Sequence, residues 1–192
     1  MSTHTTDPVG TPADHTTRWR IDPTRSRVEF RVKSFWGMAT VKGRFSRYHG
    51  TLDLAGEPAI ELTIEADSLD TENEKRDRHL RSGDFFDAEN HPYVRFVSES
   101  ATLDGERLHV QGHLHARGTS IPLELDATLR RIGDDLEVVA ATEADHRELG
   151  MTWNQMRSIG TISRLDVTGR LVRDADRRGR PAADVLRSRA RR

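Results

Sequence analysis

The chain has 192 residues, of which 34% are hydrophobic and 32% charged, and its formal net charge is −1. This length suits a single domain with tails and is sufficient to bury one sizeable core. The absence of cysteine excludes disulfides, thiolate metal sites and a cysteine nucleophile.

Residues 1–18 are predicted to form a disordered tail. The segment is rich in Thr, Pro, Asp and His and shows no hydrophobic periodicity. It has no apolar run, and no other stretch approaches the roughly 20 apolar residues of a membrane-spanning helix. We therefore expect neither a secretory signal nor a transmembrane segment, and we predict a cytoplasmic protein.

From Trp19 onward the sequence changes to an alternation of apolar and polar residues. Val28, Phe30 and Val32, for example, are separated by charged residues. This period of two is typical of a strand with one buried face. The same pattern predicts further strands over residues 41–45, 48–54 and 60–66.

A short helix is predicted over residues 73–81, in the middle of this strand series. Thr71 and Glu74 match a capping box, in which each side chain accepts a backbone N–H from the other residue. Gly83 matches a helix end. Leu80 is the only strongly apolar residue of the helix, so the helix has no wide face to bury. We expect it to cover one end of a barrel rather than to form a helical layer.

The strand pattern resumes after the helix. The predicted strands are joined by turn signals such as Asp104-Gly105 and Gly133-Asp134. Because no long helical connection separates them, neighbouring strands should pair antiparallel. About eight or nine one-faced strands in series predict an all-β fold with one short helix, as an antiparallel up-and-down β-barrel with an apolar interior. The later strands cover residues 94–96, 108–114, 121–129, 136–140 and 165–171.

Several motifs follow one another in a fixed order: Trp19-Arg20-Ile21-Asp22, Val41-Lys42-Gly43-Arg44-Phe45, Arg76-Asp77-Arg78-His79-Leu80, Asp84-Phe85-Phe86-Asp87 and His91-Pro92-Tyr93-Val94-Arg95-Phe96. In this order they resemble the YceI-like family over residues 19–172. The helix with its downstream phenylalanine pair is the most specific part. The resemblance implies a lipocalin-like β-barrel that holds an isoprenoid lipid, either a polyprenyl chain or an isoprenoid quinone.

Nine apolar side chains are predicted to line a ligand tunnel. Six lie on the apolar phase of predicted strands, and three belong to the helix and the segment after it. A polyprenyl chain could bind there without a specific polar contact, because apolar burial contributes roughly 25 cal/mol per Å². The alternative is that these side chains fill the barrel by packing on one another, with the phenylalanine pair as ordinary core rather than a barrel mouth. The nine residues are Phe30, Val32, Phe45, Leu62, Ile64, Leu80, Phe85, Phe86 and Phe96.

The charged helix residues are one candidate for chemistry. Arg76, Asp77 and His79 could form an acid–base group, but the sequence shows no partnered nucleophile or metal site beside them. We favour a structural pair of Arg76 and Asp77, with His79 anchoring the helix to the barrel. No catalytic residue is therefore predicted.

Three histidines on one strand are a second candidate. His109, His113 and His115 share a strand face, and such spacing could chelate a metal. This face is opposite the apolar face formed by Leu108 and Val110, so we favour exposed histidines on the outside of the barrel. We predict neither a metal site nor a cofactor.

Two further segments could contact a partner. Phe35, Trp36 and Met38 form an apolar cluster in a predicted loop, which suits a lipid access point or local packing under the barrel rim. Residues 173–192 hold eight Arg and three Asp, a net charge of +5. That charge suits nucleic acid or anionic lipid, but we favour a solvated, disordered tail. The predicted domain is residues 19–172.

The sequence thus predicts a protein that binds or carries an isoprenoid-type lipid without a catalytic step. The alternatives are an enzyme acting on a lipid or quinone-like molecule in the same cavity, and a stress-related structural protein with a filled core. The expected partner is an isoprenoid lipid, and no nucleic acid is expected at the barrel. Transient membrane contact and a homodimer are left open.

Overall fold

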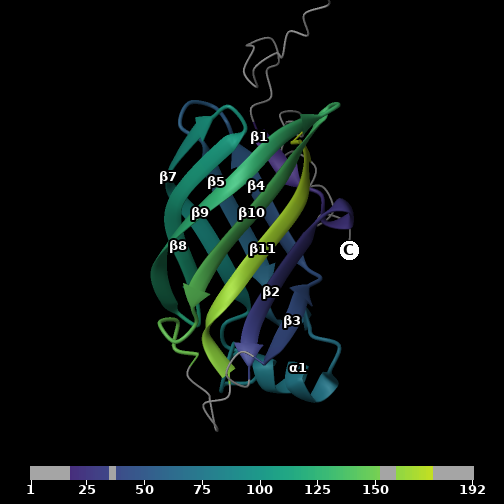
Figure 1. The fold of residues 1–192 in the computed structure, drawn as a ribbon, viewed down its shortest axis with the longest axis vertical. Helices are drawn as coiled ribbons and strands as arrows, with labels where there is room; N and C mark the ends of the chain where they lie inside the picture. The colour runs from purple at the N-terminus through teal and green to yellow at the C-terminus, as the bar shows by residue number, and fades with distance from the viewer. Residues whose placement is uncertain (1–17, 35–37, 152–158, 175–192) are drawn as a thin grey trace, which may run out of the picture.

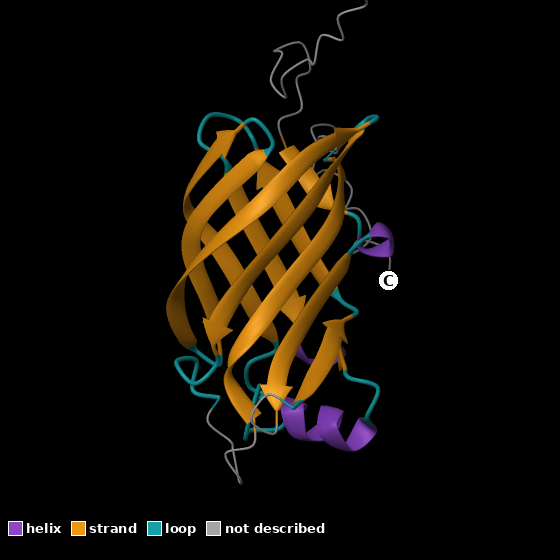
Figure 2. Cartoon of the chain, in the orientation of Figure 1, coloured by secondary structure: helices purple, strands orange, loops and turns teal. Residues whose placement is uncertain are grey.

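The computed structural model describes residues 18–34, 38–151 and 159–174, whose strands wrap into a barrel with one helix at its end (Figure 1, Figure 2). The helix α1 spans Glu74–Arg81. Short 3-10 turns lie at Pro23–Arg25 and Ala66–Ser68. The strands are β1 (Arg18–Ile21), β2 (Arg27–Ser34), β3 (Ala39–Phe45), β4 (Tyr48–Asp53), β5 (Ala59–Glu65), β6 (Leu69–Asp70), β7 (Tyr93–Asp104), β8 (Arg107–Ala116), β9 (Thr119–Ile132), β10 (Asp135–Asp145) and β11 (Ile159–Arg173).

The barrel is built by antiparallel pairing, and from β7 to β11 each strand pairs with the next one in the chain. β4 pairs with β1, and β6 pairs with β3. β11 pairs with β2 through Leu165 and Phe30, and with β1 through Leu171 and Ile21. β1 and β2 therefore act as one long interrupted strand, and their pairing with β11 closes the sheet. The result is an eight-stranded antiparallel barrel with one helix. The predicted up-and-down barrel is confirmed.

Two-residue turns connect the long hairpins at the end of the barrel away from α1. Asp104 pairs with Arg107, and Ile132 pairs with Asp135. Gly105 and Gly133 follow with φ of +61° and +63°. This left-handed backbone is open to glycine and strained for most other residues. The glycine-containing turn signals of the sequence therefore mark real hairpin turns.

The alternation of residue types places the apolar face of each strand inside the barrel. On β8, Leu108 and Val110 are buried, whereas His109 between them is exposed. On β3, Gly43 leaves room for the ring of Phe30 on β2, because a Cβ at position 43 would lie 2.4 Å from that ring. The interior is thus shaped by side-chain size as well as by the period of two.

The helix lies where the sequence predicts it, but its N-terminus is capped differently. The side-chain oxygen of Asn73 accepts a hydrogen bond from the backbone N–H of Arg76 at 3.0 Å. Asn73 directly precedes the helix, where a side-chain oxygen can satisfy an unpaired N–H. Thr71 does not cap the helix, so the predicted capping box with Glu74 is wrong.

The C-terminus of α1 also differs from the prediction. The helix ends at Arg81, and Ser82 is its C-cap with φ of −69° and ψ of 170°. The backbone N–H of Ser82 donates to the carbonyl of His79 at 3.2 Å, and the Ser82 hydroxyl donates to the same carbonyl at 2.7 Å. Because Ser82 satisfies this carbonyl without a left-handed residue, Gly83 is not the helix cap.

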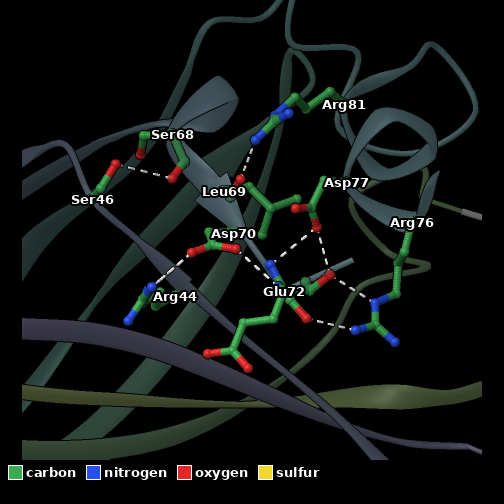
Figure 3. Close-up of polar contacts among 10 residues, drawn as sticks. Arg44, Ser46, Ser68, Leu69, Asp70, Glu72, Arg76, Asp77 and Arg81 are labelled. Atoms are coloured by element: carbon green, nitrogen blue, oxygen red, sulfur yellow. Dashed lines mark hydrogen bonds and ion pairs between the residues drawn. The ribbon is translucent and has the colours of Figure 1, made fainter. Parts of the chain in front are cut away.

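A buried polar network ties α1 to β6 (Figure 3). The Asp77 carboxylate accepts hydrogen bonds from the backbone N–H of Thr71 at 3.0 Å and from its hydroxyl. Arg76 donates to the Thr71 hydroxyl and carbonyl oxygens, each at 2.7 Å. Arg81 donates to the carbonyl of Leu69. Arg76 and Asp77 therefore have the predicted structural role, but they meet through Thr71.

The described ends of the chain lie side by side in β1 and β11. Trp19 pairs with Arg173, and the guanidinium of Arg173 lies 5.5 Å from the centre of the Trp19 ring. The backbone N–H of Asp174 donates a hydrogen bond to the carbonyl of Arg18 at 2.9 Å. The predicted tails otherwise lie outside the described residues, so their disorder stays a prediction. Among the described residues, no helix has the length and apolar character needed to cross a membrane.

Candidate functional site

The barrel encloses a cavity of about 760 Å³. Protein interiors are normally packed with few voids larger than a water molecule. Small-molecule sites, in contrast, have volumes of roughly 300–1,000 Å³. The interior of this barrel is therefore open, and its volume is that of a ligand site rather than of a packing defect.

All nine residues that the sequence predicts for a ligand tunnel line this cavity. The strands β2, β3, β5 and β7 contribute six of them, and Leu80 comes from α1. Phe85 and Phe86 follow the helix and reach the cavity from the same end. The structure thus brings the nine together around one space, and their contact with a ligand stays a prediction.

Sequence reasoning left out a comparable set of lining residues on the opposite wall. These side chains lie on β8, β9, β10 and β11 and show the same alternation, so the period of two was a sufficient signal for them. They include Val110, Leu114, Leu123, Leu125, Val138, Leu165 and Val167.

An aromatic cluster forms the wall of the cavity near α1. The rings of Phe30 and Phe45 are 5.7 Å apart, and those of Phe45 and Phe86 are 6.0 Å apart. Phe85 packs on Phe86 at 5.2 Å. Phe85 is buried, whereas Phe86 is half-buried. Phe85 therefore belongs to the core cluster, Phe86 packs against that cluster, and both face the cavity.

Substitution by alanine should lower the free energy of unfolding more at Phe85 than at Phe86. Phe85→Ala should lower the free energy of unfolding by about 3–5 kcal/mol, the range for a buried phenylalanine. Phe86→Ala should have a smaller effect, about 1–2 kcal/mol, because its side chain is only partly buried before the change. Urea unfolding followed by circular dichroism measures both. Equal losses would place Phe86 in the core rather than at the edge of the cavity.

The polar lining residues gather at the α1 end. Asn73, Lys75, Arg76 and His79 come from α1 and its cap, and Thr142, His146 and Ser163 come from β10, β11 and the segment after β10. Two further polar residues line the cavity from β4 and β5, Thr51 and Glu61. The Glu61 side chain is exposed and contacts Arg95 at 3.2 Å. The cavity is therefore apolar along most of its length and polar at one end.

His146 is the most buried of these polar side chains, with 7% of its surface exposed. Its Nδ1 lies 3.1 Å from the hydroxyl of Ser163, and its ring centre lies 5.4 Å from that of Phe85. Burial lowers the pKa of His146 below 6.5, an effect that Asp145 opposes and Arg147 reinforces. The imidazole is therefore neutral at pH 7. Sequence reasoning missed this pair, although position 146 continues the inward phase of β10.

Acidification should destabilise the fold through His146. Because the pKa is lowered only in the folded state, the unfolded chain binds the proton first as the pH falls. The contribution of neutral His146 to the free energy of unfolding is complete above about pH 6.5 and is lost progressively below it. Thermal melts should therefore show a melting temperature that falls on acidification, and His146→Gln should reduce this fall. An unchanged pH dependence in His146→Gln would assign it to other groups.

The other predicted candidates form contacts of their own. His79 lines the cavity at the α1 end, and its Nδ1 lies 3.9 Å from a carboxylate oxygen of Asp84. On the outer face of β8, His109 contacts Asp126 at 2.8 Å and His113 contacts Glu99 at 3.1 Å. Within the described ranges, no group of three metal-ligating side chains comes together.

The predicted apolar loop cluster lies largely outside the described residues. Phe35 and Trp36 are not described, and Met38 has 78% of its surface exposed. A role of this cluster in lipid access therefore stays a prediction.

The YceI-like domain model matches residues 19–171. The chain belongs to the YceI-like domain family. A UPF0312 protein of Pectobacterium carotovorum subsp. carotovorum is 37% identical to this YceI-like chain over 112 residues, which cover 56% of this chain and 58% of the relative. Protein YceI of Escherichia coli O157:H7 is 36% identical over 112 residues, which again cover 56% of this chain and 58% of the relative. This YceI-like chain thus spans about 58% of the length of the curated relatives that it matches.

Solved structures share the fold of this YceI-like domain at low identity. BcnA of Burkholderia cenocepacia has a TM-score of 0.72 and 16% identity, over 78% of this chain and 98% of BcnA. A polyisoprenoid-binding domain from Saccharophagus degradans, implicated in plant cell wall breakdown, has a TM-score of 0.68 and 13% identity, over 82% of this chain and 99% of that domain. The YceI protein of Campylobacter jejuni has a TM-score of 0.64 and 22% identity, over 88% of this chain and 97% of the Campylobacter chain. The barrel fold is therefore common to the group.

Proposed function

We propose that this protein binds a long apolar lipid of the isoprenoid type inside its barrel. The observation that carries the proposal is the cavity of about 760 Å³, whose wall is apolar along most of its length. Membership of the YceI-like family supports it. The choice of an isoprenoid chain is supported by the Saccharophagus degradans domain, which has the same fold and is polyisoprenoid-binding.

The apolar wall can supply the binding energy without a charged contact. Each buried methylene contributes about 0.8 kcal/mol, so a chain of roughly 15 buried carbons contributes on the order of 12 kcal/mol. Loss of translational and rotational freedom offsets about 4–15 kcal/mol of such a gain. Firm binding therefore needs a chain of several isoprene units.

Native mass spectrometry of the protein purified from its own cells tests this proposal. We expect an additional mass on the folded protein, and organic extraction should release an apolar lipid whose fragments show isoprenoid repeats. The matched control is the same preparation after denaturation and refolding in lipid-free buffer. A protein that emerges without lipid, and that takes up none from isoprenoid-containing vesicles, would end the proposal.

Two other functions predict different results. A filled structural barrel would leave no space of this size. An enzyme would need a nucleophile, a base and a group that orients the base. Ser163 and His146 are 3.1 Å apart, but no third group orients the imidazole among the described residues. Incubation with the extracted lipid distinguishes the two remaining functions, since a binding protein returns it unchanged.

Location and assembly stay predictions from the sequence. We propose a cytoplasmic protein, and cell fractionation with immunodetection tests this. Gel filtration with light scattering tests the homodimer.

A further inference from the structure

Two polar side chains at the polar end of the cavity contact each other. His146 comes after β10 and Ser163 lies on β11, and both side chains line the cavity. The pair is anchored by backbone hydrogen bonds, since the N–H of His146 donates to the carbonyl of Thr161 at 3.1 Å. The side chains also contact each other at 3.1 Å. Backbone and side-chain hydrogen bonds therefore position the pair at the cavity surface.

This pair retains capacity for another hydrogen bond. Nδ1 of His146 contacts Ser163, and Nε2 has no hydrogen-bond partner among the described residues. This nitrogen is not one of the fully buried unpaired atoms of the described residues, so it remains accessible to a ligand. Because polar groups in protein interiors are normally paired, an accessible Nε2 at the cavity wall can take one more hydrogen bond. A ligand oxygen beside Nε2 and the Ser163 hydroxyl would satisfy both groups, because each can donate or accept according to the tautomer.

The charges around the pair disfavour an anion. The imidazole is neutral at pH 7 because burial lowers its pKa. Asp145 and Arg147, its neighbours in the chain, are engaged with each other at 2.6 Å. From α1, Arg76 donates Nε and Nη2 to Thr71. The charged groups that act on His146 are Asp145 and Arg147. Lys75 lines the same end of the cavity from α1 but is not one of them. Among the described residues, a phosphate that contacts His146 would therefore lose hydration without a cation beside it, which is unfavourable.

The wall of the barrel is less complete beside this pair. The hydrogen-bonded ladder between β9 and β10 ends at Asp126 and Ala141. Beyond it, the hydroxyl of Thr142 donates to the carbonyl of Glu124 at 2.7 Å in place of a ladder bond. At this end a side-chain hydrogen bond therefore replaces a regular backbone bond, whereas Leu136 at the other end of β10 is buried and apolar. A head group suits the first end and a chain the second.

We propose that His146 and Ser163 are the head-group site, and that the bound lipid carries a neutral head with a hydroxyl or carbonyl oxygen. The apolar chain then extends toward Ile21, Leu52 and Leu171 at the other end of the cavity. This inference rests on the proposed lipid binding and adds the class of head group to it.

Binding of four probes with the same chain tests the inference. The probes are geranylgeraniol, its aldehyde, its diphosphate and the hydrocarbon without the oxygen, each titrated against a neutral fluorescent naphthylamine in the cavity. The wild type should bind the alcohol and the aldehyde more tightly than the diphosphate and the hydrocarbon. The ratio of alcohol to aldehyde affinity shows whether the site prefers a hydroxyl or a carbonyl.

Variants assign the preference to the pair. His146→Leu and Ser163→Ala should each weaken binding of the alcohol roughly three- to tenfold, the effect of one lost hydrogen bond, and leave the hydrocarbon unchanged. His146→Gln should retain part of the preference. Val138→Ala is the matched control on the apolar wall, and it should weaken the alcohol and the hydrocarbon equally.

The outcomes separate this inference from the proposed function. Tightest binding of the diphosphate, or equal effects of Ser163→Ala on alcohol and hydrocarbon, would overturn the head-group assignment while lipid binding stands. A wild type that binds none of the four probes would overturn both. If His146→Leu does not fold, Ser163→Ala and His146→Gln still decide the assignment, because each is a small change.

Discussion

Ile64→Asp should destabilise the protein by roughly 3–5 kcal/mol or prevent folding, and should abolish lipid retention. Ile64 lies on β5 with 8% of its surface exposed and faces the cavity. A carboxylate at this position would lose its hydration in a space lined by Phe30, Phe96 and other apolar groups. An unpaired buried charge of this kind strongly destabilises a fold. Urea unfolding gives the free energy, and organic extraction of the purified variant gives the lipid content.

Thr63→Asp is the matched control for this substitution. Thr63 is the neighbouring residue of β5, and its side chain points to the other face of the strand. Arg95 of β7 is its cross-strand partner, so an added carboxylate there gains a favourable neighbour. We expect a change of less than about 1 kcal/mol. If Ile64→Asp were as stable as this control, the cavity would hold water rather than lipid.

The period of two explains why so much of the barrel could be predicted from the sequence. Phe30 and Val32 of β2 alternate with charged residues, and the structure buries both. The pattern defines which face of a strand is apolar, and a closed barrel gives all these faces one common interior. The nine predicted lining residues meet at one cavity for this reason.

Other features depend on distances that a pattern does not contain. The inward phase alone does not determine whether opposite side chains meet, since that depends on strand tilt and barrel radius. His146 and Ser163 are brought together by the register that pairs Ala144 with Ser163, and neither residue type is unusual alone. The capping box failed because Asn73 caps the helix and the Thr71 hydroxyl instead donates to Asp77.

Ala140→Trp should weaken lipid binding about a thousandfold while the fold is retained. Ala140 lies on β10 and lines the cavity, with Val167 and Ala127 as its cross-strand partners. A tryptophan here would enter the cavity and bury much of its 150–250 Å² of surface there. If it displaces roughly five carbons of the lipid, binding should weaken by about 4 kcal/mol, about a thousandfold. Filling a cavity commonly raises stability by about 0.5–2 kcal/mol, so the melting temperature should not fall.

Val139→Trp separates this effect from any disturbance of the strand. Val139 is the neighbour of Ala140, points outward, and has 47% of its surface exposed. It should bind geranylgeraniol with wild-type affinity in the same titration. The difference in affinity between the Ala140→Trp and Val139→Trp variants depends on where the lipid chain lies and not on its head group. It therefore tests binding inside the barrel independently of the proposed role of His146. Wild-type affinity in a folded Ala140→Trp variant would mean that the lipid does not occupy the interior, and the barrel would then bind it at its surface.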